Sequence, residues 1–165
     1  MSHLDFLSPA LASPEALWRS PLERALARAP DGIEDVSRTG VLDVRGDLDG
    51  LEAPGAEVVR LTPERALVLC TFEDAGALRE RLADARRLVV DVSAGWAGLR
   101  LRNEAALRRV TDLDLDGLPA VGPLAHVRAL VLHDDAGAFR VFVPQEYGHY
   151  VAEVVLDALA GVEAA

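Results

Sequence analysis

The chain has 165 residues, half of them apolar, and a formal charge of −10. This length and apolar content suit about one domain with a packed core. All 17 basic residues are arginine, and the acidic excess would repel a polyanion, which argues against nucleic acid as a partner. The absence of lysine excludes Schiff-base chemistry and the attachment of pyridoxal phosphate.

The first residues predict a protein without an export signal. The start, MSHLDFLSPALASPEALW, has an early aspartate and no apolar core of signal-peptide length. No apolar run reaches the roughly 18 residues that a membrane helix needs. The single cysteine, Cys70, excludes an internal disulfide. We therefore expect a cytoplasmic protein with no membrane contact.

Residues 1–32 are rich in serine, proline and alanine, and we expect a loose N-terminal arm with one short helix. Ser20 followed by Pro21 and then Glu23 is a helix-start pattern, because it combines a capping hydroxyl, a proline in the first turn and a returning carboxylate. Residues 33–161 are expected to form a single α+β domain. A division into two small α+β halves that meet near residue 95 is the alternative.

From Thr39 onward the hydrophobic period changes to two, which predicts strands. The strand-like runs lie at 41–45, 57–61 and 66–70.

A helix should follow the third of these runs. Thr71 can cap its start, and the two arginines at 86–87 suit the dipole at its end. Leu78, Leu82 and Ala85 would form its buried stripe.

The segment 88–103 predicts a β-hairpin with its turn around Gly95. The expected register places Asp91 opposite Arg100 on one face. The other face would hold Val90, Val92, Leu99 and Leu101.

Asn103 can cap a second helix over 104–113. A second hairpin is expected from strands at 126–133 and 139–143, and a final helix begins near Pro144. Strand runs that alternate with single helices favour an α+β fold of antiparallel sheets with packed helices.

The stretch DLDLDG at 112–117 has the look of half a calcium loop. Counted from Asp112, Gly117 takes position six, as in an EF-hand, but Pro123 takes position twelve, where a bidentate glutamate is required. Three aspartates and a carbonyl also supply fewer oxygens than calcium needs. We therefore interpret the stretch as a solvated connection and assign no metal site.

The remaining polar residues offer little chemistry. Four histidines, at positions 3, 126, 133 and 149, show no zinc-ligand spacing. His133 beside the aspartates at 134–135 is either a weak ligand set or simple turn chemistry. Cys70 ends an apolar strand and is expected to act as a small buried hydrophobe. We assign no catalytic, cofactor-binding or metal-binding residue.

Four aromatic side chains are candidates for contact with a protein partner: Trp18, Trp96, Tyr147 and Tyr150. A tryptophan at a hairpin tip, as expected for Trp96, is a common interface anchor. The alternative is that Trp96 packs back onto its own core.

Several motifs resemble the gamma subunit of heterotetrameric sarcosine oxidase over roughly residues 19–160. The loop at 114–122 departs from that pattern, since Leu118 replaces an aromatic residue. The motifs are RSPL at 19–22, VLDVRGD at 41–47, LTPERALVL at 61–69, VVDVSAGWAGLRLRN at 89–103 and FRVFVPQEYGHYVAEVVLDAL at 139–159.

This resemblance implies the folate-binding-like fold of the glycine cleavage T-protein and a cofactor-free, non-catalytic subunit. The partners would be the alpha and beta subunits, with FAD, FMN, NAD and tetrahydrofolate bound there. The complex would oxidatively demethylate sarcosine to glycine. Two alternatives stand beside it: a free-standing folate-binding protein of one-carbon transfer, and a diverged domain of this fold with a different partner.

Overall fold

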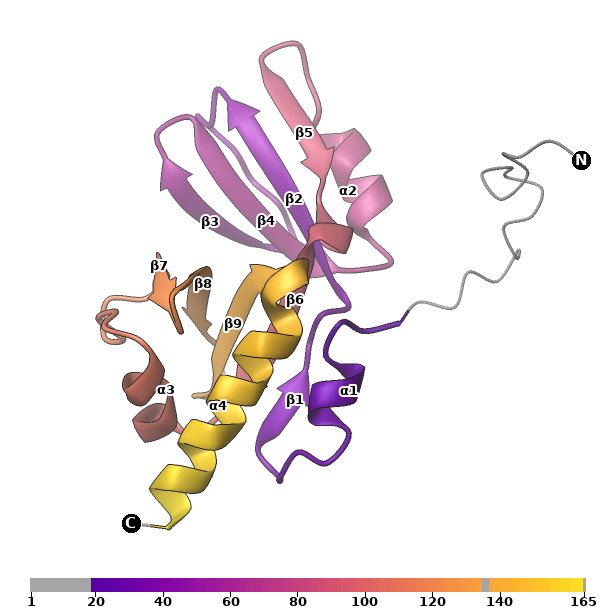
Figure 1. Ribbon diagram of the computed structural model, residues 1–165. Coiled ribbons are helices and arrows are strands. Elements are labelled where there is room, and N and C mark those ends of the chain that lie inside the picture. The colour runs from indigo at the N-terminus through magenta and orange to yellow at the C-terminus, as the bar shows by residue number, and fades with distance from the viewer. Residues whose placement is uncertain (1–18, 135–136, 165) are drawn as a thin grey trace, which may run out of the picture.

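The computed structural model describes residues 19–134 and 137–164. In this part of the chain, antiparallel strands form two sheets, and helices pack on them (Figure 1). The strands are β1 (Ile33–Asp35), β2 (Thr39–Gly46), β3 (Glu57–Thr62), β4 (Arg65–Thr71), β5 (Arg87–Asp91), β6 (Trp96–Leu101), β7 (Ala120–Leu124), β8 (Val127–His133) and β9 (Phe139–Pro144). The helices are α1 (Glu23–Leu26), α2 (Ala75–Leu82), α3 (Glu104–Val110) and α4 (Gly148–Glu163), with short 3₁₀ turns η3 (Ser93–Gly95) and η4 (Gln145–Tyr147).

One sheet is built from a continuous stretch of the chain, and the other is built from segments on both sides of that stretch. The five-stranded sheet has the order β1-β6-β9-β8-β7, and the four-stranded sheet has the order β3-β4-β2-β5. The second sheet is therefore built from the continuous stretch 39–91, which interrupts the first between β1 and β6. The expected fold class, α+β with antiparallel sheets and packed helices, is confirmed.

The elements form four layers, because each sheet buries both of its faces over part of its area. Helices α1, α3 and α4 cover one face of the five-stranded sheet, and the other face of that sheet meets the four-stranded sheet. Helix α2 covers the opposite face of the four-stranded sheet. Figure 1 shows the four-stranded sheet extending away from the five-stranded one. Representative core residues are Leu99, Val141 and Val151 under α4, Leu67, Leu130 and Phe142 between the sheets, and Leu42, Val68 and Leu78 under α2.

Packing is tight around Gly98 on β6, between its β9 partner Phe142 and the residue that follows β1. The carbonyl of Gly98 accepts a hydrogen bond of 2.8 Å from the backbone N–H of Val36 in the connection to β2. A Cβ at position 98 would lie 2.8 Å from Cε1 of Phe142 and 2.9 Å from the carbonyl oxygen of Val36. Only glycine lets the two backbones pass at this distance.

Of the predicted helix caps Asn103 and Thr71, only Asn103 caps a helix. The side chain of Asn103 accepts a hydrogen bond from the Ala106 N–H and begins α3, as expected. Thr71 does not cap α2: its hydroxyl accepts from the N–H of Asp74 at 3.3 Å, in a turn that precedes the helix. Helix α2 ends at Leu82, so Ala85 lies outside it and is exposed.

The hairpin expected over 88–103 is wrong. Strand β5 pairs with β2, where Asp91 lies opposite Leu42, and β6 pairs with β1 and β9, where Arg100 lies opposite Glu34 and Arg140. The turn η3 carries the chain from one sheet to the other instead of folding it back. The hairpin of β8 and β9 is confirmed, although β8 begins one residue after His126.

Candidate interaction surface

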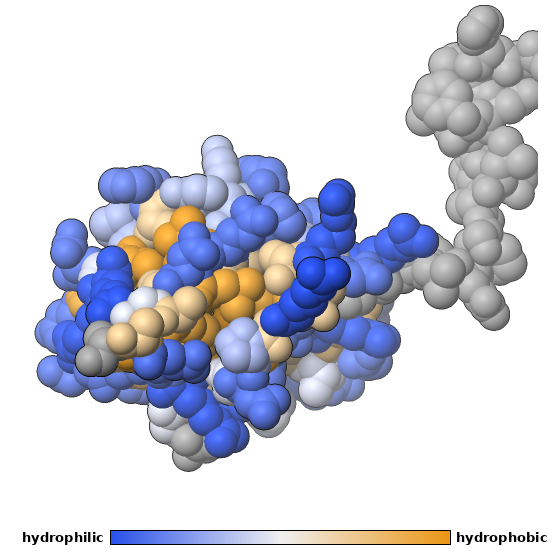
Figure 2. All heavy atoms as spheres, turned by 60° about the horizontal axis from the view of Figure 1, so that its bottom comes forward, coloured by the Kyte–Doolittle hydropathy of each residue, from blue (hydrophilic) through white to orange (hydrophobic). Residues whose placement is uncertain are grey.

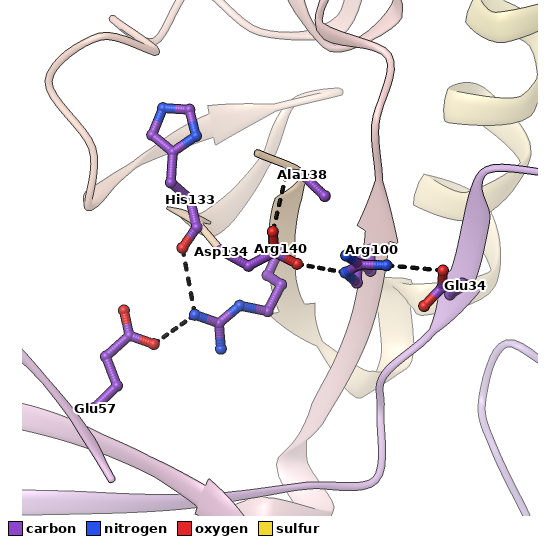
Figure 3. Close-up of polar contacts among 7 residues, drawn as sticks. All are labelled: Glu34, Glu57, Arg100, His133, Asp134, Ala138 and Arg140. Atoms are coloured by element: carbon purple, nitrogen blue, oxygen red, sulfur yellow. Dashed lines mark hydrogen bonds and ion pairs between the residues drawn. The ribbon is translucent and has the colours of Figure 1, made fainter. Parts of the chain in front are cut away.

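A groove with a volume of about 950 Å³ opens where the two sheets meet, and ion pairs line it (Figure 3). Arg100 on β6 donates to Glu34 at 2.8 Å and also to Asp134, which follows β8. Arg140 on β9 reaches across to Glu57 on β3 at 2.5 Å. The Arg140–Glu57 pair therefore joins the two sheets, whereas the contacts of Arg100 tie together strands of the five-stranded sheet.

The groove is balanced in charge rather than open to a ligand anion. Each of these two guanidinium groups already has a carboxylate partner, and so does Arg38, whose Nη2 lies 2.6 Å from Glu73. The hydrogen bonds to Asp134 and Glu34 raise the pKa of Arg100 above its ordinary value, which keeps the network ionised. The arrangement suits a device that fixes the angle between the sheets.

Cys70 also lines the groove, at the end of β4. Burial, followed by the charges of Asp74 and Asp91, raises the pKa of the Cys70 thiol above its ordinary value. A raised pKa lowers the thiolate fraction near neutral pH, which argues against a role as nucleophile. The sequence predicted a small buried hydrophobe; Cys70 packs against the core under α2 but is only partly buried.

A second charged cluster lies on the four-stranded sheet, centred on Asp43 of β2. Its carboxylate is buried and accepts hydrogen bonds from Arg45 at 2.6 and 3.0 Å and from Arg65 at 2.9 and 3.0 Å. Burial raises the pKa of Asp43, but the hydrogen bonds from Arg65 and Arg45 outweigh it and hold the pKa below its usual value. The guanidinium side chains themselves are 56% exposed for Arg45 and 42% exposed for Arg65.

Two aliphatic side chains of the edge strand β5 continue this face. Leu88 lies directly opposite Arg45, and Val90 lies directly opposite Asp43, so all of them share one side of the sheet. Leu88 is 59% exposed and Val90 is 40% exposed. Neither belongs to a core cluster, whereas Val89, which points to the other side, packs under α2. We refer to Arg45, Arg65, Leu88 and Val90 as the β5 face.

Tyr147 and Tyr150 lie together at the start of α4 and are 47% and 45% exposed. Tyr150 also lines a hollow of about 310 Å³ with Arg109 and His126. Figure 2, which views the molecule from the end that carries the C-terminus, shows a band of apolar surface framed by hydrophilic side chains. Four half-buried apolar residues of α4 pack against the core between this helix and the five-stranded sheet: Val154, Leu156, Ala158 and Val162.

The other two aromatic candidates, Trp96 and Trp18, are not shown beside the two tyrosines at the start of α4. Trp96 is the first residue of β6, opposite Pro144, and is half-buried against the core between the sheets. Because η3 replaces the expected hairpin, Trp96 is not at a hairpin tip, and its position matches the alternative that it packs on its own core. Trp18 lies outside the described residues.

The acidic stretch after α3 is a connection between α3 and β7. Asp112, Asp114 and Asp116 are exposed, while Leu115 between them is buried. The ring Nε2 of His133 lies 3.1 Å from the carbonyl oxygen of Leu115. Among residues 19–134 and 137–164, no three or more His, Cys, Asp or Glu side chains gather as a metal site would require. No helix in the same ranges is long and apolar enough to span a bilayer.

The sequence prediction missed Leu88 and Val90 because the supposed hairpin gave Val90 a buried partner. One signal was available. Positions 88–90 are apolar without alternation, which indicates a strand that carries apolar side chains on both faces. An edge strand of that kind leaves one of those faces uncovered unless another element or another chain covers it.

No protein-family model matches the sequence, and no curated protein matches it at a significant level. Among solved structures, the chain is similar to a chain of heterotetrameric sarcosine oxidase from Corynebacterium sp. U-96 in complex with pyrrole 2-carboxylate. The TM-score is 0.73 at 20% identity, over 90% of this chain and 98% of that one.

The chain is also similar to glycine cleavage system aminomethyltransferase T from Bartonella henselae, with a TM-score of 0.57 at 17% identity. That match covers 82% of this chain and 48% of the aminomethyltransferase chain, so this protein spans about half the length of that enzyme. At these identities the likeness concerns the fold. The chain therefore has the fold shared by a sarcosine oxidase chain and part of the T-protein, as the sequence motifs predicted.

Proposed function

We propose that this chain is a non-catalytic, gamma-type subunit of a heterotetrameric sarcosine oxidase in the cytoplasm. The observation that carries the proposal is the difference in extent between the two structural matches. The similarity runs over 98% of the sarcosine oxidase chain but over 48% of the aminomethyltransferase chain. The match to the sarcosine oxidase chain also has the higher TM-score, 0.73 against 0.57, and both differences support a subunit role.

In this role, oxidative demethylation of sarcosine to glycine takes place on the other subunits. FAD, FMN, NAD and tetrahydrofolate would be bound by the alpha and beta chains. The chemistry of the described residues supports a structural role, because the groove between the sheets pairs its arginines with carboxylates and burial raises the pKa of Cys70, which disfavours its thiolate. The acidic surface is compatible with a partner that presents complementary charge.

Co-expression with alpha and beta chains of a sarcosine oxidase tests this proposal. The expected result is a flavin-containing complex that retains this chain in fixed stoichiometry through size-exclusion chromatography. The proposal fails if the flavoenzyme assembles at full activity and never retains the chain.

The half-length match to the aminomethyltransferase supports a second candidate, a free-standing folate-binding protein of one-carbon transfer. Titration of the isolated chain with a reduced folate separates the two, because Trp96 is half-buried between the sheets and would report a ligand bound nearby. The subunit proposal predicts no saturable change in tryptophan fluorescence. Saturable quenching at micromolar folate would favour the second candidate.

A further inference from the structure

The β5 face has the composition of a protein interface rather than of ordinary solvated surface. Leu88 and Val90 project side by side from an edge strand, outside every core cluster of the described chain. Exposure of aliphatic side chains to water is unfavourable in free energy. An open sheet edge that carries apolar side chains is therefore a site where another chain can pack. Arginine is among the residues that are enriched in interface hot spots.

The charge of this face is opposite to that of the whole chain. Arg45 and Arg65 share the single carboxylate of Asp43, which leaves one net positive charge at the surface of a chain whose formal charge is −10. At the same end Arg86 is matched by Asp47 at 2.7 Å, and Glu64 lies in the turn before β4, so the positive excess is confined to the two guanidinium groups on Asp43. The face would therefore attract a surface that carries carboxylates.

The arginines are also held in place before any partner arrives. Asp43 binds each guanidinium through two hydrogen bonds and is itself 5% exposed, so the pair of arginines is anchored from below. Side chains that are already ordered lose less conformational entropy on binding. The outward guanidinium edges stay available, since both side chains are about half-exposed.

We propose that the β5 face docks onto another subunit of the oxidase, at a surface with apolar side chains at its centre and aspartate or glutamate at its rim. This inference rests on the proposed function and assigns the part of this chain that makes the contact. A second copy of this chain is a poorer occupant, because a two-fold interface would bring the positive cluster of one copy against the same cluster of the other.

The test uses the complex of this chain with the alpha and beta chains and two matched double variants. Leu88→Ser with Val90→Ser removes the apolar centre of the β5 face. Tyr147→Ser with Tyr150→Ser removes an equally exposed pair at the start of α4. Urea unfolding of each isolated variant checks that it is folded before affinity for the other subunits is measured.

We expect the β5 double variant to weaken assembly by about ten-fold or more and the tyrosine double variant to change it by less than about two-fold. Arg45→Glu should weaken assembly as well, by a factor that shrinks as salt rises from 50 to about 500 mM. Arg81→Glu, an exposed reversal of the same size on α2, is the matched charge control and should change assembly by less than about two-fold.

The outcomes separate the two levels of the proposal. If wild-type chain is not retained by the oxidase subunits, the proposed function fails and the docking surface falls with it. If wild-type chain is retained and the β5 double variant binds as tightly, the function stands and the docking surface is wrong.

A loss confined to the tyrosine variant would assign the contact to α4. Loss of self-association by the β5 variant in the isolated chain would assign it to a second copy. Either result overturns the inference.

Discussion

The β5 face and the start of α4 each expose two large side chains to a similar extent, yet they differ in what lies beneath and beside them. Tyr147 and Tyr150 are followed along α4 by residues that pack against the core under that helix. Leu88 and Val90 lie outside the core clusters and beside two arginines anchored on one buried aspartate.

The difference shows that exposed fraction alone does not identify an interface. A tyrosine can keep its hydroxyl in water while its ring packs on a neighbour, so its partial exposure occurs both at interfaces and on free surfaces. Leucine and valine have no polar atom, and here they continue a positive cluster on the open edge of a sheet. The comparison favours the β5 face as the docking surface, and the changes below test it in order of expected effect.

Replacing Asp43 by alanine should have the largest effect on the isolated chain. The change leaves Arg45 and Arg65 adjacent without their shared carboxylate, and we expect a loss of about 2–3 kcal/mol in unfolding free energy. Urea denaturation measures it. The control is Asp47→Ala, which removes a more exposed ion pair with Arg86 and should cost less than about 1 kcal/mol. Equal losses in the two variants would show that Asp43 does not anchor the β5 face.

The stabilisation by Asp43 should also depend on pH in one direction. Its folded-state pKa is held below the ordinary value of 3.8, so its contribution is complete above that value and is lost as pH falls toward the folded-state pKa. The difference in unfolding free energy between wild type and Asp43→Asn should therefore be constant near neutral pH and shrink below about pH 4. A difference that grows on acidification would contradict the ion-pair account.

Trp96→Ala should have the next largest effect, because Trp96 is half-buried against the core between the sheets. We expect a loss of about 1–2 kcal/mol, below the 3–5 kcal/mol of fully buried aromatic residues. Tyr147→Ala should cost less than about 0.5 kcal/mol, since its side chain is exposed. Thermal or urea unfolding of both variants distinguishes a core tryptophan from a surface one.

The sequence predicted the elements that depend on local patterns but not the pairing of strands that are remote in the chain. Local patterns identified strands β2, β3 and β4, the cap of α3 by Asn103 and the hairpin of β8 and β9, because each depends on residues close in the chain. The partner of β5 is β2, more than forty residues earlier, and no pattern within 88–103 reveals it. Periodicity sets which residues share a face but not which strand lies beside them.

Long-range pairing also explains why the candidate surface was missed. Asp43, Arg45 and Arg65 meet only because β2 and β4 pair with Arg45 opposite Arg65, and Leu88 joins them through β5. The network of Arg100 with Glu34 and Asp134 likewise joins three strands or strand ends that are remote in sequence. In contrast, the acidic loop was read correctly as a connection, since Pro123 at the twelfth position is a purely local signal.

Leu88→Ser with Val90→Ser should change the stability of the isolated chain only slightly, by less than about 1 kcal/mol in total. The reason is that neither side chain contributes to a core cluster. A loss of 2 kcal/mol or more would mean that these residues support the fold of the four-stranded sheet and would remove the reason to regard them as a surface for a partner.

The most direct measurement of the central claim is hydrogen–deuterium exchange of this chain, free and assembled with the alpha and beta chains. Docking through the β5 face predicts slower exchange in peptides that cover 87–91 and 43–45 on assembly, with little change in peptides that cover 147–150. Protection at 147–150 with none at 87–91 would contradict the account and place the contact on α4.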